Sequence, residues 1–181
     1  MWIRKLHGSD LFVGAAACAV CIGLTLSASA AARHGKSANA DQQFMTEAIQ
    51  GDLAEVNMGK LAQQKGQSDR VKQYGQMLEQ DHSEHLQKAQ QVASQNGLKA
   101  PSEPNAMQQS MYQKLSSMPA DKFDAAFARD MVRDHEKDIG KYRKEASSGS
   151  PLADFAKQTV PVLQKHLQNA EALTSNRAAS K

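Results

Sequence analysis

Cysteine, proline, aromatic and β-branched residues are all scarce in this chain of 181 residues. The two cysteines, Cys18 and Cys21, lie in one apolar run near the N-terminus, so a disulfide-bonded scaffold is excluded. Aromatic residues make up 5% of the chain, and only eleven Val, Ile and Thr residues follow residue 30, against 19 Gln and many Ala, Lys, Glu and Leu. This composition favours helices over strands.

A predominance of one charge is also lacking. The chain has 22 Lys and Arg against 19 Asp and Glu, and the formal net charge of +3 is spread along its length. Proteins that bind nucleic acids usually have a clustered basic face, so we expect no nucleic-acid partner. The sequence also contains no Gly-rich phosphate loop, no zinc-ribbon cysteine pattern and no Ser/His/Asp or Cys/His nucleophile set.

The N-terminal segment has the three-part pattern of a secretory signal peptide. Arg4 and Lys5 precede an apolar run at 11–26, and small residues follow at 27–32. A retained membrane anchor is the alternative, but the run is shorter than the ~20 residues that span a bilayer. We therefore predict a signal peptide at 1–30, a periplasmic or outer-membrane-associated location, and no transmembrane anchor in the mature chain.

Helical periodicity dominates the rest of the chain after a polar leader at 31–40, which is predicted to be disordered. Four long segments have this periodicity: 42–65, 68–96, 120–147 and 151–175. Short connections make the first and second segments antiparallel, and likewise the third and fourth. The long connection between the two pairs is predicted to contain a short helix at 105–117. The sequence thus predicts an all-α, antiparallel four-helix bundle at 41–175 with one long crossover, followed by a flexible tail at 176–181.

Proline marks two positions in the last long segment. Ser150 and Pro151 fit the N-cap and first turn of a helix, where the missing N–H of proline does no harm. Pro161 lies inside the segment and predicts a kink, with a break into two shorter helices as the alternative.

Each long segment directs one ionisable residue into the middle of its apolar face. These residues are Glu55, His82, His135 and His166. Glu55 and His82 lie on one antiparallel pair, and His135 and His166 on the other. Counted from the turn that connects each pair, the two residues differ in position along the helix axis by about three residues, or about 4.5 Å. We therefore expect all four side chains to meet in one layer of the core. Imidazole and carboxylate together suit Fe(II), Mn(II), Zn(II) or Cu(II), so this layer is a candidate metal site.

Further candidates for this layer or its surroundings are Glu79, Asp81, His85, Asp124 and Asp134. Glu79 and His82 have the Glu-x-x-His spacing found on helices of di-iron proteins. A metal-free polar layer, in which Glu55 is hydrogen bonded to neutral or proton-sharing histidines, is the alternative. The layer would then fix helix register, and the protein would act in the envelope by binding a membrane or cell-wall surface or another protein.

Short motifs recur in a defined order between Phe44 and Leu173. They are Phe44 with Ala48, Glu55-Val56-x-x-Gly59-x-Leu61-Ala62, Val71-Lys72, Met77-Leu78-x-x-Asp81-His82, Phe123-Asp124, Met131-Val132-x-Asp134-His135, Phe155-Ala156 and Pro161-x-Leu163-x-x-His166-Leu167. This order resembles an exported bacterial domain of unknown function, often described as a predicted outer-membrane protein and placed in the ferritin-like superfamily. The resemblance implies a ferritin-like four-helix bundle, export to the periplasm or envelope, and no established activity.

The chain departs from true ferritins at the predicted site. Ferritins carry Glu on their first and third helices and Glu-x-x-His on the second and fourth. Here the third long segment has His135, and Leu163 precedes His166 by three residues. A mononuclear site of three histidines and one glutamate therefore fits better than a carboxylate-bridged di-iron centre. These residues predict transition-metal binding in the handling of metals or oxidative stress.

Overall fold

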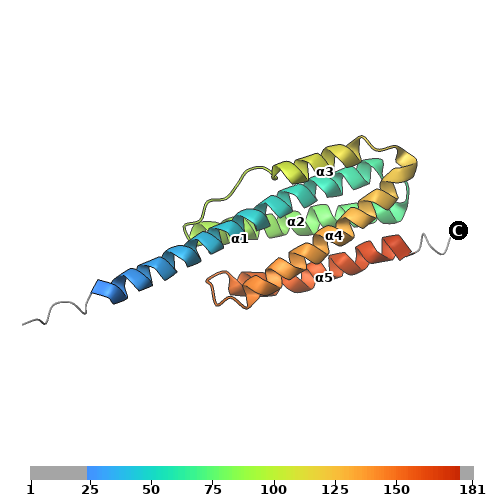
Figure 1. Cartoon of the computed structure of the whole chain (residues 1–181). Helices are drawn as coiled ribbons and strands as arrows, with labels where there is room; N and C mark the ends of the chain where they lie inside the picture. Colours follow the sequence, from blue (N-terminus) through green and yellow to red (C-terminus); the bar gives the residue numbers. More distant parts are fainter. Residues whose placement is uncertain (1–23, 176–181) are drawn as a thin grey trace, which may run out of the picture. The chain divides into compact units, whose positions relative to one another are not determined.

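The computed structural model describes residues 24–175, with side chains from residue 38 onward. All regular secondary structure in this part is helical, which confirms the all-α class: α1 (Leu24–Lys65), α2 (Asp69–Gln95), α3 (Ala106–Ser116), α4 (Ala120–Ala146) and α5 (Ala153–Ser175) (Figure 1). Residues 1–23 of the predicted signal peptide, which include both cysteines, and the predicted tail lie outside the described residues. Among the described helices, none is long and apolar enough to cross a membrane.

The first helix begins earlier than the sequence analysis predicts. α1 starts at Leu24 rather than near residue 42, so the polar segment 31–40 is helical. Alanine, the best helix former, is frequent in this stretch. The chain divides into two compact units, residues 1–35 and 36–181, and the packing described below belongs to the second unit.

Side-chain caps fix the starts of α2 and α3. Ser68 is the N-cap of α2 and accepts a hydrogen bond from the backbone N–H of Val71. Asn105 and Gln108 form a capping box at the start of α3. The bounds of α2, α3 and α4 lie within one residue of those predicted from the sequence.

The last helix starts slightly later than predicted and then continues without a break. Ser150 Oγ accepts a hydrogen bond from the N–H of Leu152, but the helix begins only at Ala153. Pro161 lies inside α5, which runs on to Ser175, so the alternative of two separate helices is wrong.

Two glycines bring the backbones of α1 and α2 into close contact. A Cβ atom on Gly75 would lie 2.7 Å from the carbonyl oxygen of Gly59, and a Cβ on Gly59 would lie 2.5 Å from the carbonyl oxygen of Gly75. The two helices are antiparallel (Figure 1). Asp52 lies about two turns before Gly59 and His82 about two turns after Gly75, so the glycine contact places these two side chains at the same height.

Substituting Gly75 tests this close contact. We expect Gly75→Ala to lower the free energy of unfolding by about 1–3 kcal/mol, because the added methyl group must push the helices apart. Gly140, on α4, is the matched control, since a Cβ there meets no described atom within 4 Å. Gly140→Ala is expected to stabilise the protein by about 0.5–1 kcal/mol. Urea unfolding measures both, and equal midpoints for the two variants would contradict the close contact.

The buried residues form two apolar clusters with a polar layer between them. One cluster contains Leu61, Leu78 and Phe127, and the other contains Ile49 and Ile139. Between them lie buried polar side chains: Asp52, Glu55, His82, His135 and His166. Burying this many ionisable groups is costly unless they are paired, so their partners decide what the layer can do.

Candidate metal centre

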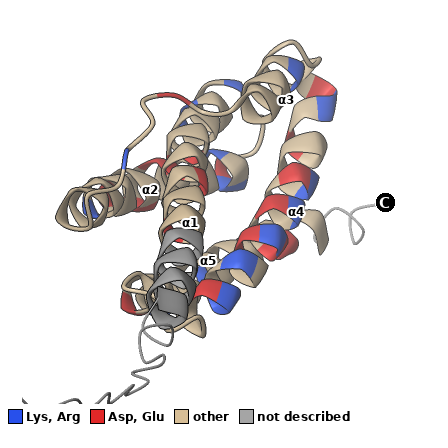
Figure 2. Cartoon of the chain, turned by 60° about the vertical axis from the view of Figure 1, so that its left-hand side comes forward, with Lys and Arg blue, Asp and Glu red and all other residues tan. Residues whose placement is uncertain are grey.

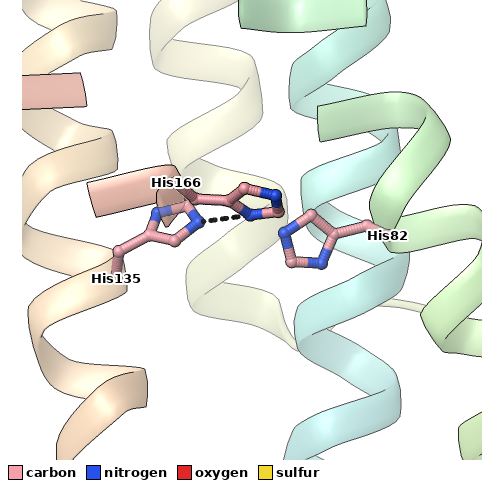
Figure 3. Close-up of side chains that lie close together, drawn as sticks. All are labelled: His82, His135 and His166. Carbon is pink, nitrogen blue, oxygen red and sulfur yellow. Dashed lines mark hydrogen bonds between the residues drawn. The ribbon is translucent and has the colours of Figure 1, made fainter. Parts of the chain in front are cut away.

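Three histidines from three helices meet in the polar layer. His82 on α2, His135 on α4 and His166 on α5 each offer a ring nitrogen, and these nitrogens lie within 4.8 Å of one another (Figure 3). All three side chains are buried, with 6%, 2% and 1% of their surface exposed. Facing rings of this kind need either protons or a cation between their nitrogens.

Asp52 fixes the orientation and tautomer of His82. Its Oδ1 atom lies 2.9 Å from His82 Nδ1 and 2.9 Å from His85 Nδ1. Burial alone would raise the pKa of Asp52, but hydrogen bonds from the two histidines outweigh it and lower the pKa. Because a carboxylate only accepts, His82 Nδ1 donates its proton to Asp52. The other nitrogen, His82 Nε2, is fully buried and has no hydrogen-bond partner among the described residues.

His135 and His166 are held in the same way, each by one of its ring nitrogens. His135 Nδ1 lies 2.9 Å from the carbonyl oxygen of Met131, which can only accept a hydrogen bond. His166 Nε2 lies 2.8 Å from Asp81 Oδ2, at the edge of the core. Burial, together with the neighbouring His82, lowers the pKa of His135 to about 3 and that of His166 to about 4. Both rings are therefore neutral at pH 7, with one proton each.

The remaining ring nitrogens of these two histidines carry lone pairs that face each other. His135 Nε2 and His166 Nδ1 lie 3.3 Å apart, the contact drawn as a dashed line in Figure 3. Each ring already donates its only proton elsewhere, so neither nitrogen has a proton for this contact. With His82 Nε2, three inward lone pairs share one small volume.

This arrangement matches what a transition metal requires. Histidine ligands commonly donate their second ring N–H to a carboxylate or backbone carbonyl, which orients the ring and raises its basicity. Two nitrogens bound tetrahedrally at 2.0–2.1 Å lie about 3.3 Å apart. The His135–His166 separation has this value. Three imidazoles are a ligand set suited to Zn, Cu or Fe.

Glu55, the fourth predicted ligand, is buried in the same layer but stands outside the group of three imidazoles. Its carboxyl group contacts that of Asp134, and burial, with Asp134 second, raises the pKa of Glu55 well above its usual value. Its Oε2 atom is buried without a hydrogen-bond donor in the described part of the chain. Coordination by Glu55 stays a prediction.

The other sequence candidates occupy distinct places. Asp81 holds His166, as described above. Glu79 accepts a hydrogen bond from Gln63 and lies 3.8 Å from Lys60. Asp124 accepts hydrogen bonds from the backbone N–H groups of the α1–α2 turn, which makes it a structural residue.

His85 lies beside the three imidazoles but belongs to a separate contact. Its Nδ1 contacts Asp52 and its Nε2 lies 2.9 Å from Thr159 Oγ1. The ring stacks on Phe155 with a centroid distance of 4.9 Å. His85 therefore supports the carboxylate that holds His82, rather than facing the shared volume.

Asp52 is the residue that the sequence analysis missed. It is 3% exposed and contacts two histidines. One signal was available, because Asp52 lies one turn before Glu55 next to Gly51, on the small-residue face of α1. An aspartate on such a face is buried when a neighbouring helix packs closely, and here the glycine contact brings α2 near.

The comparison with protein families covers nearly all of this fold. Residues 26–173 match the family described as Domain of unknown function (DUF4142). No curated protein and no solved structure matches the chain. The match includes α2, α3 and α4 entirely and all three clustered histidines. The chain therefore belongs to the DUF4142 family of uncharacterised domains.

Proposed function

We propose that this protein binds one transition-metal ion at His82, His135 and His166. The observation that carries the proposal is the set of three inward lone pairs, each on a ring whose other nitrogen donates to a carboxylate or carbonyl group. A stable protein without a metal would have to leave these lone pairs in mutual contact or share an added proton among them. The low pKa values of His135 and His166 disfavour that proton.

The wider setting of this function rests on the sequence. Four long helices and one short crossover helix are consistent with a ferritin-like four-helix bundle. The N-terminal pattern supports export to the periplasm or the outer membrane. The protein would then handle a transition metal, or the oxidative stress that such metals cause, in the cell envelope.

Metal titration of the purified protein tests the proposal. We expect one equivalent of Zn(II), Fe(II) or Cu(II) by elemental analysis after removal of excess metal. Because the ion binds the folded state, it should stabilise the protein by about 2.7 kcal/mol at a free concentration one hundred times Kd. The increase in Tm measures this effect.

The metal-free alternative predicts a different result. If the polar layer only fixes helix register, bound metal stays well below one equivalent, and no ion raises Tm. A chelator would then leave Tm unchanged as well. That outcome would overturn the metal proposal and favour an envelope protein that acts through surface contacts.

A further inference from the structure

A cleft of about 410 Å³ opens beside the polar layer. It is lined by residues of α1, α3 and α4 together with Asn105, the N-cap of α3. Asp and Glu positions, red in Figure 2, occur on α1 and α4, and Lys and Arg positions are mixed with them on α4. Among the cleft residues are four carboxyl groups, Glu47, Glu55, Asp134 and Asp138, against the two lysines Lys137 and Lys141.

The outer carboxylates of the cleft are paired with lysine. Lys141 lies 2.9 Å from Glu47 and 3.3 Å from Asp138. These three side chains are partly exposed, between 22% and 38%. The pairs therefore lie where the cleft meets solvent.

The inner carboxyl groups have no such partner in the described salt bridges. Glu55 is 3% exposed, lines the cleft, and has a buried Oε2 atom without a donor among the described residues. It contacts the carboxyl group of Asp134. Two carboxyl groups in contact need a proton or a cation between them. An unpartnered buried oxygen on a residue that lines a cleft is therefore a feature that a cation would satisfy.

Some residues that line the cleft are neighbours of His135 or of the residue that holds His82. Met131 lines the cleft, and its carbonyl oxygen accepts the hydrogen bond from His135. Asp134 directly precedes His135 in α4. On α1, Glu55 lies one turn from Asp52, which holds His82. The cleft thus leads from solvent to the surroundings of the imidazoles.

We propose that this cleft is the port through which a divalent transition-metal cation reaches the three histidines. Glu55 and Asp134 form a transient binding site for the cation on this route. This inference rests on the metal site proposed above. The outer carboxylates attract the cation, and Lys141 limits that attraction by pairing with them. The inner pair then binds the cation before the imidazoles do.

The rate of metal uptake tests this port. Co(II) is a suitable probe, because its visible absorption bands report coordination by nitrogen, and stopped-flow mixing gives the loading rate. We expect Glu55→Gln to slow loading by about tenfold, within the range by which aligned charges accelerate association. The equilibrium affinity for Co(II) should stay within about threefold of wild type, since the imidazoles are intact. Glu136→Gln, on an exposed position of α4, makes the same substitution away from the cleft and is the matched control.

A second variant should act in the opposite direction. Lys141→Gln frees Glu47 and Asp138, so we expect loading to become severalfold faster, which a damaged fold would not produce. Equal loading rates for wild type, Glu55→Gln and Lys141→Gln would overturn the port. A loss of affinity in Glu55→Gln as large as its slowing would also overturn it, by making Glu55 a ligand. If wild type binds no Co(II) at all, the metal site itself is wrong.

Discussion

His82→Ala is expected to lower the affinity for Zn(II) by at least about a hundredfold, whereas His85→Ala should lower it by no more than about tenfold. The two histidines lie one turn apart on α2, and both contact Asp52. Only His82 belongs to the group of three imidazoles. Loss of a group that merely orients a ligand typically costs 10–100-fold in affinity, so the loss of a ligand should exceed this and the loss of His85 should fall at its lower end.

Isothermal titration and the Zn(II)-dependent change in Tm measure this difference. The His85→Ala variant also controls for stability, because it too removes a hydrogen bond from the buried carboxylate of Asp52. Equal affinities in the two variants would show that the three imidazoles do not form the site. A larger loss of Zn(II) affinity in His85→Ala than in His82→Ala would indicate that the metal binds at Asp52, His85 and Thr159 instead.

The sequence predicted the helices and the inward histidines because both depend on local periodicity. Apolar residues recur around His82, His135 and His166 at helical spacing, so the buried face of each helix follows from the sequence alone. In the structure, the caps Ser68 and Asn105 mark the starts of α2 and α3. The start of α1 was missed because the prediction relied on the polarity of residues 31–40 rather than on the high helix propensity of alanine.

Which carboxylate contacts the histidines depends on helix register, which periodicity does not reveal. Counting from the connecting turn placed Glu55 near His82, with an uncertainty of about one helical turn. The contact between Gly59 and Gly75 sets the register instead, and it brings Asp52 level with His82. An error of one turn in the register shifts a residue by about 5.4 Å along the helix axis. This is small compared with the length of a helix but larger than any coordination bond. The sequence could therefore predict that these residues share one layer, but not which carboxylate contacts which histidine.

The same geometry explains why the layer needs several outer partners. Each imidazole lies between two clusters of mostly apolar side chains. Asp52, Asp81 and the Met131 carbonyl group satisfy one nitrogen of each ring and so direct the other nitrogen inward. Orientation and metal-binding capacity thus arise from the same three hydrogen bonds.

The burial of neutral His135 should make the stability of the metal-free protein depend on pH. Its pKa is about 3 in the folded state because burial, with the neighbouring His82 and His166, disfavours the charged ring. In the unfolded chain the ordinary value is about 6.5. As the pH falls below about 6.5, the unfolded state therefore gains a proton that the folded state does not. This contribution to stability is complete above about pH 6.5 and is lost by about 1.4 kcal/mol per pH unit down to about pH 3.

His135→Leu isolates this effect, because leucine fills the buried site without a titrating group. The unfolding free energy of wild type relative to His135→Leu should fall by about 1.4 kcal/mol per unit as the pH is lowered from 6.5 to 4. Glu55 and Asp138 have raised pKa values, the latter about 6, and act in the opposite direction. They are present in both proteins, so their contribution cancels in the difference. Urea unfolding with a chelator at pH 4, 5, 6 and 7 measures it, and a difference independent of pH would mean that His135 is not held neutral.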